Sequence, residues 1–355
     1  MTDNAAGERD PGGGRAFIGS FTSAGGRGVV AADVDRETGA LTVTGATDAV
    51  ADPSFLAPAT DRAVLYAVSE TEAGAVAAFD TSGPAPRLIG APVPVRGAGP
   101  AHLTIASGHV LTADYGSGGV TVLPLGPDGV PRAATDALRH RGSGPDPDRQ
   151  AGPHAHQVLP DPSGRWVLSV DLGTDSVRVC ALDPATGRLT QHGETALPPG
   201  SGPRHLAFHP SGGHVYVLCE LEPTLYVCRW DAHTGGLDAV AGTSVLPSGA
   251  ETAGRYPSGL VVAPDGRCVW AAVRGSDAIA VLRLDGPDEK PFLTSTVPCG
   301  GHWPRDLTLD PRGRRLYVAN ERSGDVTWFA LDPATGVPER AGAIAVPAAS
   351  CVVLV

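Results

Sequence analysis

Short runs of mostly apolar residues alternate with polar turns along almost the whole chain. One stretch shows the order clearly. The run Pro203-Arg-His-Leu-Ala-Phe-His-Pro210 leads into a Ser-Gly turn and is followed by His214-Val-Tyr-Val-Leu-Cys219 and Leu225-Tyr-Val-Cys-Arg-Trp230. Runs of this length, rich in β-branched and aromatic residues and bounded by turn residues, predict antiparallel β-strands.

A turn sequence, Asp-x-x-Thr-Gly, recurs after the third run of each unit, where Asp accepts local hydrogen bonds and Gly supplies a positive φ. Clear copies stand at 35–39, 183–187, 231–235 and 332–336, and weaker counterparts at Asp80, Asp128 and Asp285. Neighbouring copies are 45 to 55 residues apart. A period of about 50 residues is typical of propeller blades. Since a less regular fourth run completes each unit, we predict an all-β, seven-bladed β-propeller with four-stranded antiparallel blades.

The two ends of the chain supply complementary parts of one blade. The run at 15–21 resembles a second strand, because 28–35 follows it as a third, whereas 347–355 resembles a lone first strand. A C-terminal strand that completes the N-terminal blade would remove its open edge. We therefore expect a single propeller domain over 15–355, preceded by a polar, disordered leader at 1–14.

Composition fits this architecture and excludes several partners. The 355 residues include 47 Gly and 33 Pro, yet 42% are hydrophobic, which indicates a folded chain with many turns. The length exceeds the roughly 250–300 residues of a single core, but small cores repeated around an axis accommodate it. A formal charge of −11 argues against nucleic acid. No apolar run approaches about 18 residues and no signal peptide is visible, so we expect no membrane partner and a cytoplasmic location.

The lysine, cysteine, serine and histidine positions limit the kinds of catalysis to expect. Lys290 is the only lysine and lies in a loop-like stretch, which disfavours imine chemistry. The six cysteines show no Cys-x-x-Cys spacing, and we expect buried, reduced thiols. No Gly-x-Ser-x-Gly elbow joins a strand to a helix, so a serine nucleophile is not expected. His154 and His156 could share a face as metal ligands do, but no carboxylate-rich cage accompanies them, and we predict neither metal nor cofactor.

Alignment of the units on their turns places polar residues at corresponding positions. His156, Arg204 and Arg305 each stand six residues before a turn proline, at the start of the innermost strand, and Ser54 and Ser258 occupy similar places. We take Asp171, Glu220 and Asn320 as equivalent at the end of the second strand, with Arg274 one residue further along. Because these two strand ends are adjacent in an antiparallel blade, both sets should form one ring at one mouth of the axis.

Several segments resemble the bacterial lactonase family, the seven-bladed 6-phosphogluconolactonases. They include the specific block Ser143-Gly-Pro-Asp-Pro-Asp-Arg-Gln-Ala-Gly-Pro-His-Ala-His156 and shorter segments at 52–55, 66–70, 171–175, 202–205, 219–221 and 273–277. The resemblance extends from Arg15 to Val355. It implies a cytosolic lactonase of the pentose phosphate pathway that acts on 6-phospho-D-glucono-1,5-lactone. The family also includes fungal carboxymuconate cyclases, which form a lactone by proton transfer.

By similarity to those cyclases, the expected catalytic residues are His156, Arg204, Glu220 and Arg274. Either His156 or Glu220 could be the base that activates water, and the arginines could stabilise the oxyanion or hold an anionic group. We expect substrate contacts from Arg305, His154, His205, Glu70, Asp171 and Asn320. The expected ligand is a small anionic lactone. A lactonising cycloisomerase and a non-catalytic binding propeller remain alternatives, and the oligomeric state stays open.

Overall fold

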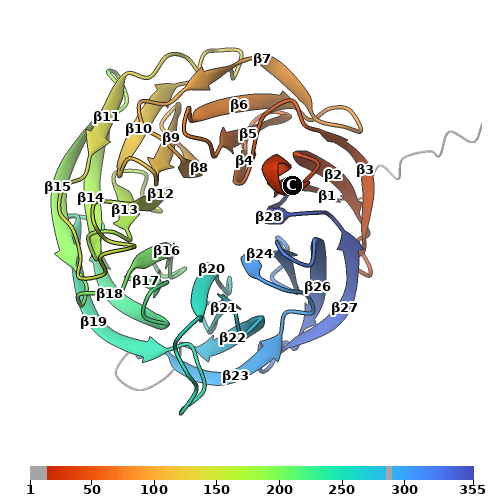
Figure 1. Ribbon diagram of the computed structural model, residues 1–355, viewed down its shortest axis with the longest axis vertical. Helices are drawn as coiled ribbons and strands as arrows, with labels where there is room; N and C mark the ends of the chain where they lie inside the picture. The colour runs from red at the N-terminus through yellow and green to blue at the C-terminus, as the bar shows by residue number, and fades with distance from the viewer. Residues whose placement is uncertain (1–13, 285–289) are drawn as a thin grey trace, which may run out of the picture.

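The computed structural model describes residues 14–284 and 290–355, and in that part of the chain it contains seven four-stranded antiparallel sheets arranged in a ring (Figure 1). This confirms the predicted all-β, seven-bladed propeller. The first four sheets, each from the axis outward, are β28 (Ala349–Leu354), β1 (Gly14–Ser20), β2 (Val29–Val34) and β3 (Leu41–Thr47); β4 (Leu56–Pro58), β5 (Val64–Ser69), β6 (Ala75–Asp80) and β7 (Arg87–Pro94); β8 (Pro100–Ala106), β9 (His109–Asp114), β10 (Gly119–Pro124) and β11 (Asp136–Arg139); β12 (Ala155–Pro160), β13 (Val167–Asp171), β14 (Ser176–Asp183) and β15 (Arg188–Ala196).

The remaining three sheets follow the same order from the axis to the rim. They are β16 (Pro203–Phe208), β17 (His214–Cys219), β18 (Thr224–Asp231) and β19 (Gly236–Ser244); β20 (Tyr256–Val262), β21 (Cys268–Arg274), β22 (Ala278–Arg283) and β23 (Phe292–Pro298); β24 (Pro304–Leu309), β25 (Arg315–Asn320), β26 (Asp325–Leu331) and β27 (Pro338–Ala345). One short 3₁₀ helix, η1 (Thr22–Ala24), is present in the described ranges, and no helix there is long and apolar enough to cross a membrane.

The C-terminal strand closes the ring, as expected from the sequence. β28 pairs antiparallel with β1 through Ala16↔Leu354, Phe17↔Val353 and Ile18↔Val352, and both strands lie together in Figure 1. β1 begins at Gly14, one residue before the expected start of the domain. The rest of the expected leader (1–13) and the weak turn at Asp285 lie outside the described residues.

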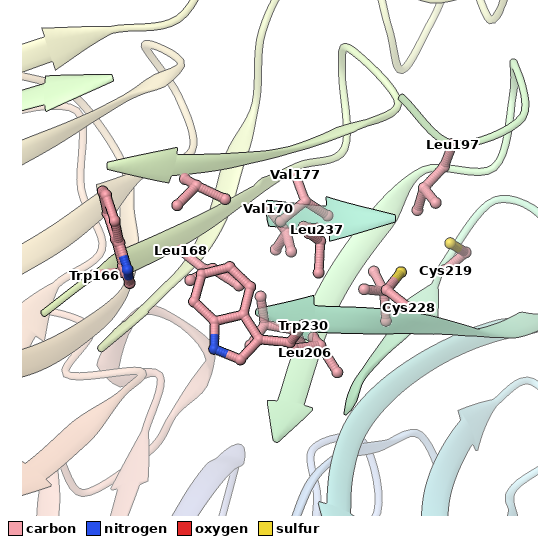
Figure 2. Close-up of a cluster of buried hydrophobic side chains, with 13 residues drawn as sticks. Trp166, Leu168, Val170, Val177, Leu197, Leu206, Cys219, Cys228, Trp230 and Leu237 are labelled. Carbon is pink, nitrogen blue, oxygen red and sulfur yellow. The ribbon is translucent and has the colours of Figure 1, made fainter. Parts of the chain in front are cut away.

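The hydrophobic cores lie between the blades. Among the described residues there are seven clusters of buried apolar side chains, each spanning two adjacent sheets. Figure 2 shows the cluster that joins the β12–β15 and β16–β19 sheets, where Trp166 and Leu168 lie near Trp230. All six cysteines are buried free thiols, as expected. Each blade is therefore stabilised mainly by its neighbours, since a single sheet buries little by itself.

The Asp-x-x-Thr-Gly turns join the third and fourth strands of a blade and contact the neighbouring blade. At the first copy, Asp35 accepts hydrogen bonds from Thr38, and Gly39 adopts φ +75°. The Gly39 carbonyl accepts a hydrogen bond from the Tyr317 hydroxyl of the preceding blade at 2.9 Å. A Cβ at Gly39 would lie 2.3 Å from Arg315 Cδ, so both the backbone angle and the close approach require glycine. Trp270 donates to the Gly336 carbonyl in the same way.

Candidate functional site

A β-bulge near the start of the innermost strand directs three of the expected site residues. The register of β12, β16 and β24 against their partners shifts between Ala155 and Gln157, Pro203 and His205, and Pro304 and Asp306. The residues skipped at these shifts are His156, Arg204 and Arg305. A bulge adds one residue and reorients its side chain. The same irregularity in three blades therefore brings an imidazole and two guanidinium groups to one end of the axis.

The ends of the second strands supply the other side of this site, but not in the expected register. Cys219, Asp171 and Asn320 are the residues that pair with the first strands, so Glu220 follows one position later. Arg274 occupies the same later position, because Val273 is the residue opposite Pro257. The expected equivalence of Glu220 with Asp171 and Asn320 is wrong. A shift of one residue turns a strand side chain to the other face.

Asp171 and Asn320 are accordingly not brought to the mouth. Both are fully buried. Asp171 accepts a 2.6 Å hydrogen bond from His140 Nδ1 and further bonds from the backbone N–H groups of His154 and Gly173. Asn320 Nδ2 donates to Asp325. These side chains hold the blade ends together, and neither has exposed surface for a ligand to contact.

Glu220 is the centre of the site. Its carboxylate lies 2.7 Å from Arg274 Nη2, 2.7 Å from Arg149 Nη2 and 3.1 Å from Arg204 Nε. The Arg204 contact is a close ion pair whose N–H is not aligned as a hydrogen bond. Burial alone would raise the pKa of Glu220, but Arg274, Arg204 and Arg149 outweigh it and lower the pKa to about 2. Glu220 is therefore ionised at any pH at which the protein would work.

The two inner arginines are buried cations. Arg204 and Arg274 are 3% and 7% exposed. Burial, with repulsion from Arg274, lowers the pKa of Arg204 to about 9, which leaves the side chain protonated at neutral pH. Arg274 is oriented by hydrogen bonds to the carbonyls of Tyr256 and Pro257 at 3.1 and 3.2 Å. Fixed, desolvated guanidinium groups are well suited to stabilise negative charge.

His156 is buried beside this cationic group, and its Nδ1 has no hydrogen-bond partner among the residues that the structure describes. Burial, and then the positive charges of Arg204, Arg305 and Arg274, hold the pKa of His156 well below its usual value. The imidazole is therefore neutral at physiological pH. A neutral imidazole with a free ring nitrogen can accept a proton.

Further histidines and aromatic rings line the site, and only some were expected. His205 lies with its ring centroid 5.4 Å from His156 and 5.9 Å from His102, and its Nε2 is 3.4 Å from Arg204 Nη1. His154 stacks on Tyr115 at 4.6 Å, and Tyr115 also meets His156 edge-on at 5.4 Å. The sequence did not single out His102, Tyr115 or Arg149. The aligned bulge positions could have indicated His102, because it follows the skipped residue in its blade, just as His205 does.

Arg305 differs from the inner arginines because it has its own acidic partners. Glu321 accepts a 3.0 Å hydrogen bond from its Nη1, and Glu70 lies 3.8 Å from its Nη2. Burial alone would lower the pKa of Arg305, but Glu70 and Glu321 outweigh it and raise the pKa. Arg305 and Glu70 thus join one ion-pair network at the mouth, with less free positive charge than the group around Glu220.

A hollow of about 420 Å³ opens beside Arg149 and Tyr256 and is also lined by Asp146, Asp148, Leu221, Thr252, Ala253 and Gly254. A separate hollow at the β1–β25 seam is lined by none of the site residues. Within residues 14–284 and 290–355, no group of three or more His, Cys, Asp or Glu side chains could hold a metal ion.

Fold and site together define a seven-bladed β-propeller with an arginine-rich site at one end of its axis. The family model described as Lactonase, 7-bladed beta-propeller matches residues 15–354. The chain therefore belongs to this lactonase family, which confirms the resemblance inferred from the sequence.

Named relatives and solved structures match nearly the whole chain. The 6-phosphogluconolactonase of Bacillus subtilis (strain 168) is 31% identical over 325 residues, which cover 90% of this chain and 92% of that protein. The crystal structure of a proposed 6-phosphogluconolactonase from Bacteroides fragilis NCTC 9343 has a TM-score of 0.90 and 29% identity, and the match covers 98% and 99% of the two chains. The periplasmic gluconolactonase PpgL of Pseudomonas aeruginosa, at 24% identity and a TM-score of 0.87 over 97% and 99% of the chains, shares the fold.

Proposed function

We propose that this protein is a lactone hydrolase that acts on 6-phospho-D-glucono-1,5-lactone. The observation that carries the proposal is the neutral, buried His156 with a free Nδ1 beside Arg204 and Arg274, whose positive charge is only partly balanced by Glu220. The Bacillus subtilis relative that carries the name 6-phosphogluconolactonase supports the choice of substrate.

In the proposed reaction, His156 accepts a proton from water while the water oxygen attacks the lactone carbonyl. Arg204 and Arg274 stabilise the tetrahedral oxyanion that forms. When the ring C–O bond breaks, the protonated imidazole donates its proton to the departing alkoxide, which yields the hydroxy acid and restores neutral His156. General acid–base help of this kind contributes about 10²- to 10⁴-fold, and each oxyanion donor about 10²- to 10³-fold.

Glu220 has a positioning role in this scheme. A carboxylate with a pKa of about 2 is a weak base, which favours His156 for the proton transfer. Its contacts with Arg149, Arg204 and Arg274 instead hold three guanidinium groups in place and balance part of their charge. We therefore propose His156 as the base and Glu220 as a positioning residue, two roles that the sequence left open.

The test is a panel of lactones assayed against the spontaneous rate, because 1,5-lactones hydrolyse without an enzyme. We expect acceleration of 6-phospho-D-glucono-1,5-lactone hydrolysis and a loss of about 10²-fold or more in His156→Ala. The matched control is His233→Ala, since His233 is an exposed residue of a blade turn. Hydrolysis no faster than the spontaneous rate for every lactone would refute the proposal. Net formation of a lactone from an unsaturated acid would identify a cycloisomerase instead.

A further inference from the structure

Arg149 is part of the site, but unlike the other site arginines it does not lie on a strand of the repeated blades. It lies in the loop between β11 and β12, whereas Arg204 and Arg274 lie on strands. Its side chain is 35% exposed, compared with 4% for Arg204 and 8% for Arg274. Arg149 is therefore the arginine of the Glu220 group that a ligand can reach from the side of the hollow, which it also lines.

The loop that carries Arg149 is held by specific contacts. Gln150 is fully buried, and its Nε2 donates to the Leu172 carbonyl at 2.8 Å and to Asp175 Oδ1 at 2.7 Å. Asp146 Oδ1 accepts the backbone N–H groups of Asp148 and Arg149. Arg149 is thus placed at the mouth by a fixed loop. A preorganised cation loses little conformational freedom when it binds an anion.

The net positive charge of the Glu220 group can balance a doubly charged anion. Arg149, Arg204 and Arg274 surround one carboxylate, so the group carries a net charge of two positive. A phosphate monoester carries a charge of about −1.5 to −2 at pH 7. The whole protein has a net charge of −11, so an anion needs a local attraction of this kind to bind.

Arg149 also keeps donors for a ligand. Its two side-chain contacts in the described part of the chain, to Glu220 Oε1 at 2.7 Å and to the Tyr115 hydroxyl at 3.3 Å, both come from Nη2. A guanidinium group has five N–H donors in a fixed planar arrangement that suits phosphate oxygens. Arg204 and Arg274, which are more deeply buried and whose charges act on His156, remain for the carbonyl that reacts.

We propose that Arg149 binds the phosphate group of the substrate and thereby selects phosphorylated lactones over neutral ones. The inference rests on the proposed function and places the phosphate against the exposed side of the Arg149 guanidinium group. Of the two aspartates that also line the hollow, Asp148 is exposed, and Asp146 Oδ1 already accepts the backbone N–H groups of Asp148 and Arg149. Arg149 is a specificity-determining residue in this view, and Arg204 and Arg274 act on the reacting carbonyl. Arg149 should therefore favour phosphorylated ligands over ligands without a phosphate, whether or not the ligand contains a lactone ring.

The first test compares 6-phospho-D-glucono-1,5-lactone with D-glucono-1,5-lactone in Arg149→Gln. We expect KM for the phosphorylated lactone to rise about 10- to 100-fold, the loss of charge-assisted hydrogen bonds to one anion. Because Arg149 also contacts Glu220, kcat/KM for the neutral lactone should fall as well, but at least about 10-fold less than for the phosphorylated lactone. Arg141→Gln is the matched control, because it removes an exposed arginine from the same loop. Equal losses on both lactones, or no loss on either, would overturn the proposal.

A second test separates this proposal from the reaction itself. Calorimetry measures the binding of 6-phosphogluconate and of gluconate, which share a carboxylate and differ in the phosphate. Arg149→Gln should weaken 6-phosphogluconate binding about 10- to 100-fold and weaken gluconate binding far less, because gluconate has no phosphate group. This result without lactone turnover would reject the proposed reaction and retain the phosphate site. Equal weakening of both ligands, or intact turnover with unchanged 6-phosphogluconate binding, would reject Arg149 as the phosphate ligand.

Discussion

The carboxylate of Glu220 lies 2.7 Å from the guanidinium group of Arg274, and both side chains are more than nine-tenths buried. Glu220 follows Cys219, the last residue of β17 that pairs with the innermost strand, and Arg274 follows Val273, which holds the position of Cys219 in its own blade. Their pairing across two blades creates a desolvated cationic site around one fixed anion. The removal of either partner therefore leaves an uncompensated buried charge.

Glu220→Gln should impair both turnover and stability. The neutral amide leaves Arg149, Arg204 and Arg274 without their shared counter-ion, so their mutual repulsion displaces the guanidinium groups. We expect turnover to fall by about 10²-fold or more and stability to fall by about 3–5 kcal/mol, as for other broken buried pairs. Steady-state kinetics and urea unfolding check the two effects. Wild-type turnover with a lower unfolding midpoint would limit Glu220 to a structural role.

Acid should destabilise the protein through its buried neutral histidines. Burial, reinforced by Arg204, lowers the pKa of His102 to about 3, below its usual value of 6.5. A histidine with a depressed folded pKa binds its proton more readily when unfolded. The free energy of unfolding is therefore insensitive to His102 above pH 6.5. As the pH falls from 6.5 toward 3, the unfolded chain binds a proton that the folded protein does not, and the free energy of unfolding falls by up to about 1.4 kcal/mol per pH unit. His156 and His205 act in the same direction.

The measurement is the urea midpoint of unfolding at pH 7.5 and pH 5.5. We expect a lower midpoint at pH 5.5 in the wild type and a smaller drop in His102→Gln, which removes one of these groups. His233→Gln is the control, because His233 is exposed and its loss should leave the pH dependence unchanged. Equal midpoints at both pH values in the wild type would contradict the neutral state of the buried histidines.

The pH dependence of turnover should report His156. Because burial and the nearby arginines keep the pKa of His156 well below 6.5, the imidazole is already the free base at neutral pH. We expect the enzymatic component of kcat/KM to stay flat from about pH 8 down to 6.5, with its fall only at lower pH. Initial rates corrected for spontaneous hydrolysis at each pH provide the measurement. A half-maximal rate near pH 6.5 would indicate a normal imidazole pKa and an exposed base.

Repetition made the fold readable from the sequence. Seven copies of the same order of strands and turns fixed the blade count, and the unpaired runs at both ends indicated the closure of β1 by β28. His156, Arg204 and Arg305 were found because each stands at the same distance from a turn proline. Features that repeat in every blade can be inferred from a single chain by internal comparison.

The rest of the site depends on features that do not repeat. Arg149 comes from the β11–β12 loop, which is longer than the other described connections between blades, so no aligned counterpart could indicate it. The sequence predicts Asp171 and Asn320 at the mouth because both stand at the end of a second strand. A single-residue difference in register instead turns them into the blades and turns Glu220 toward the arginines. Such a shift depends on β-bulges, which leave little trace in hydrophobic patterning.

Ring closure should depend on Gly19, where β1 meets both the C-terminal strand and the next blade. A Cβ at this position would lie 2.4 Å from the Pro53 carbonyl oxygen and 2.9 Å from Cys351 Sγ, so Gly19→Ala must push β1 away from β28 or from the segment that precedes β4. We expect a loss of about 1–3 kcal/mol, typical of overpacking, measured by thermal or urea unfolding. Gly193→Ala on the outer strand β15 is the control, because no heavy atom lies within 4 Å of its added Cβ. Equal stability of the two variants would show that the β1–β28 seam tolerates displacement and does not control closure of the propeller.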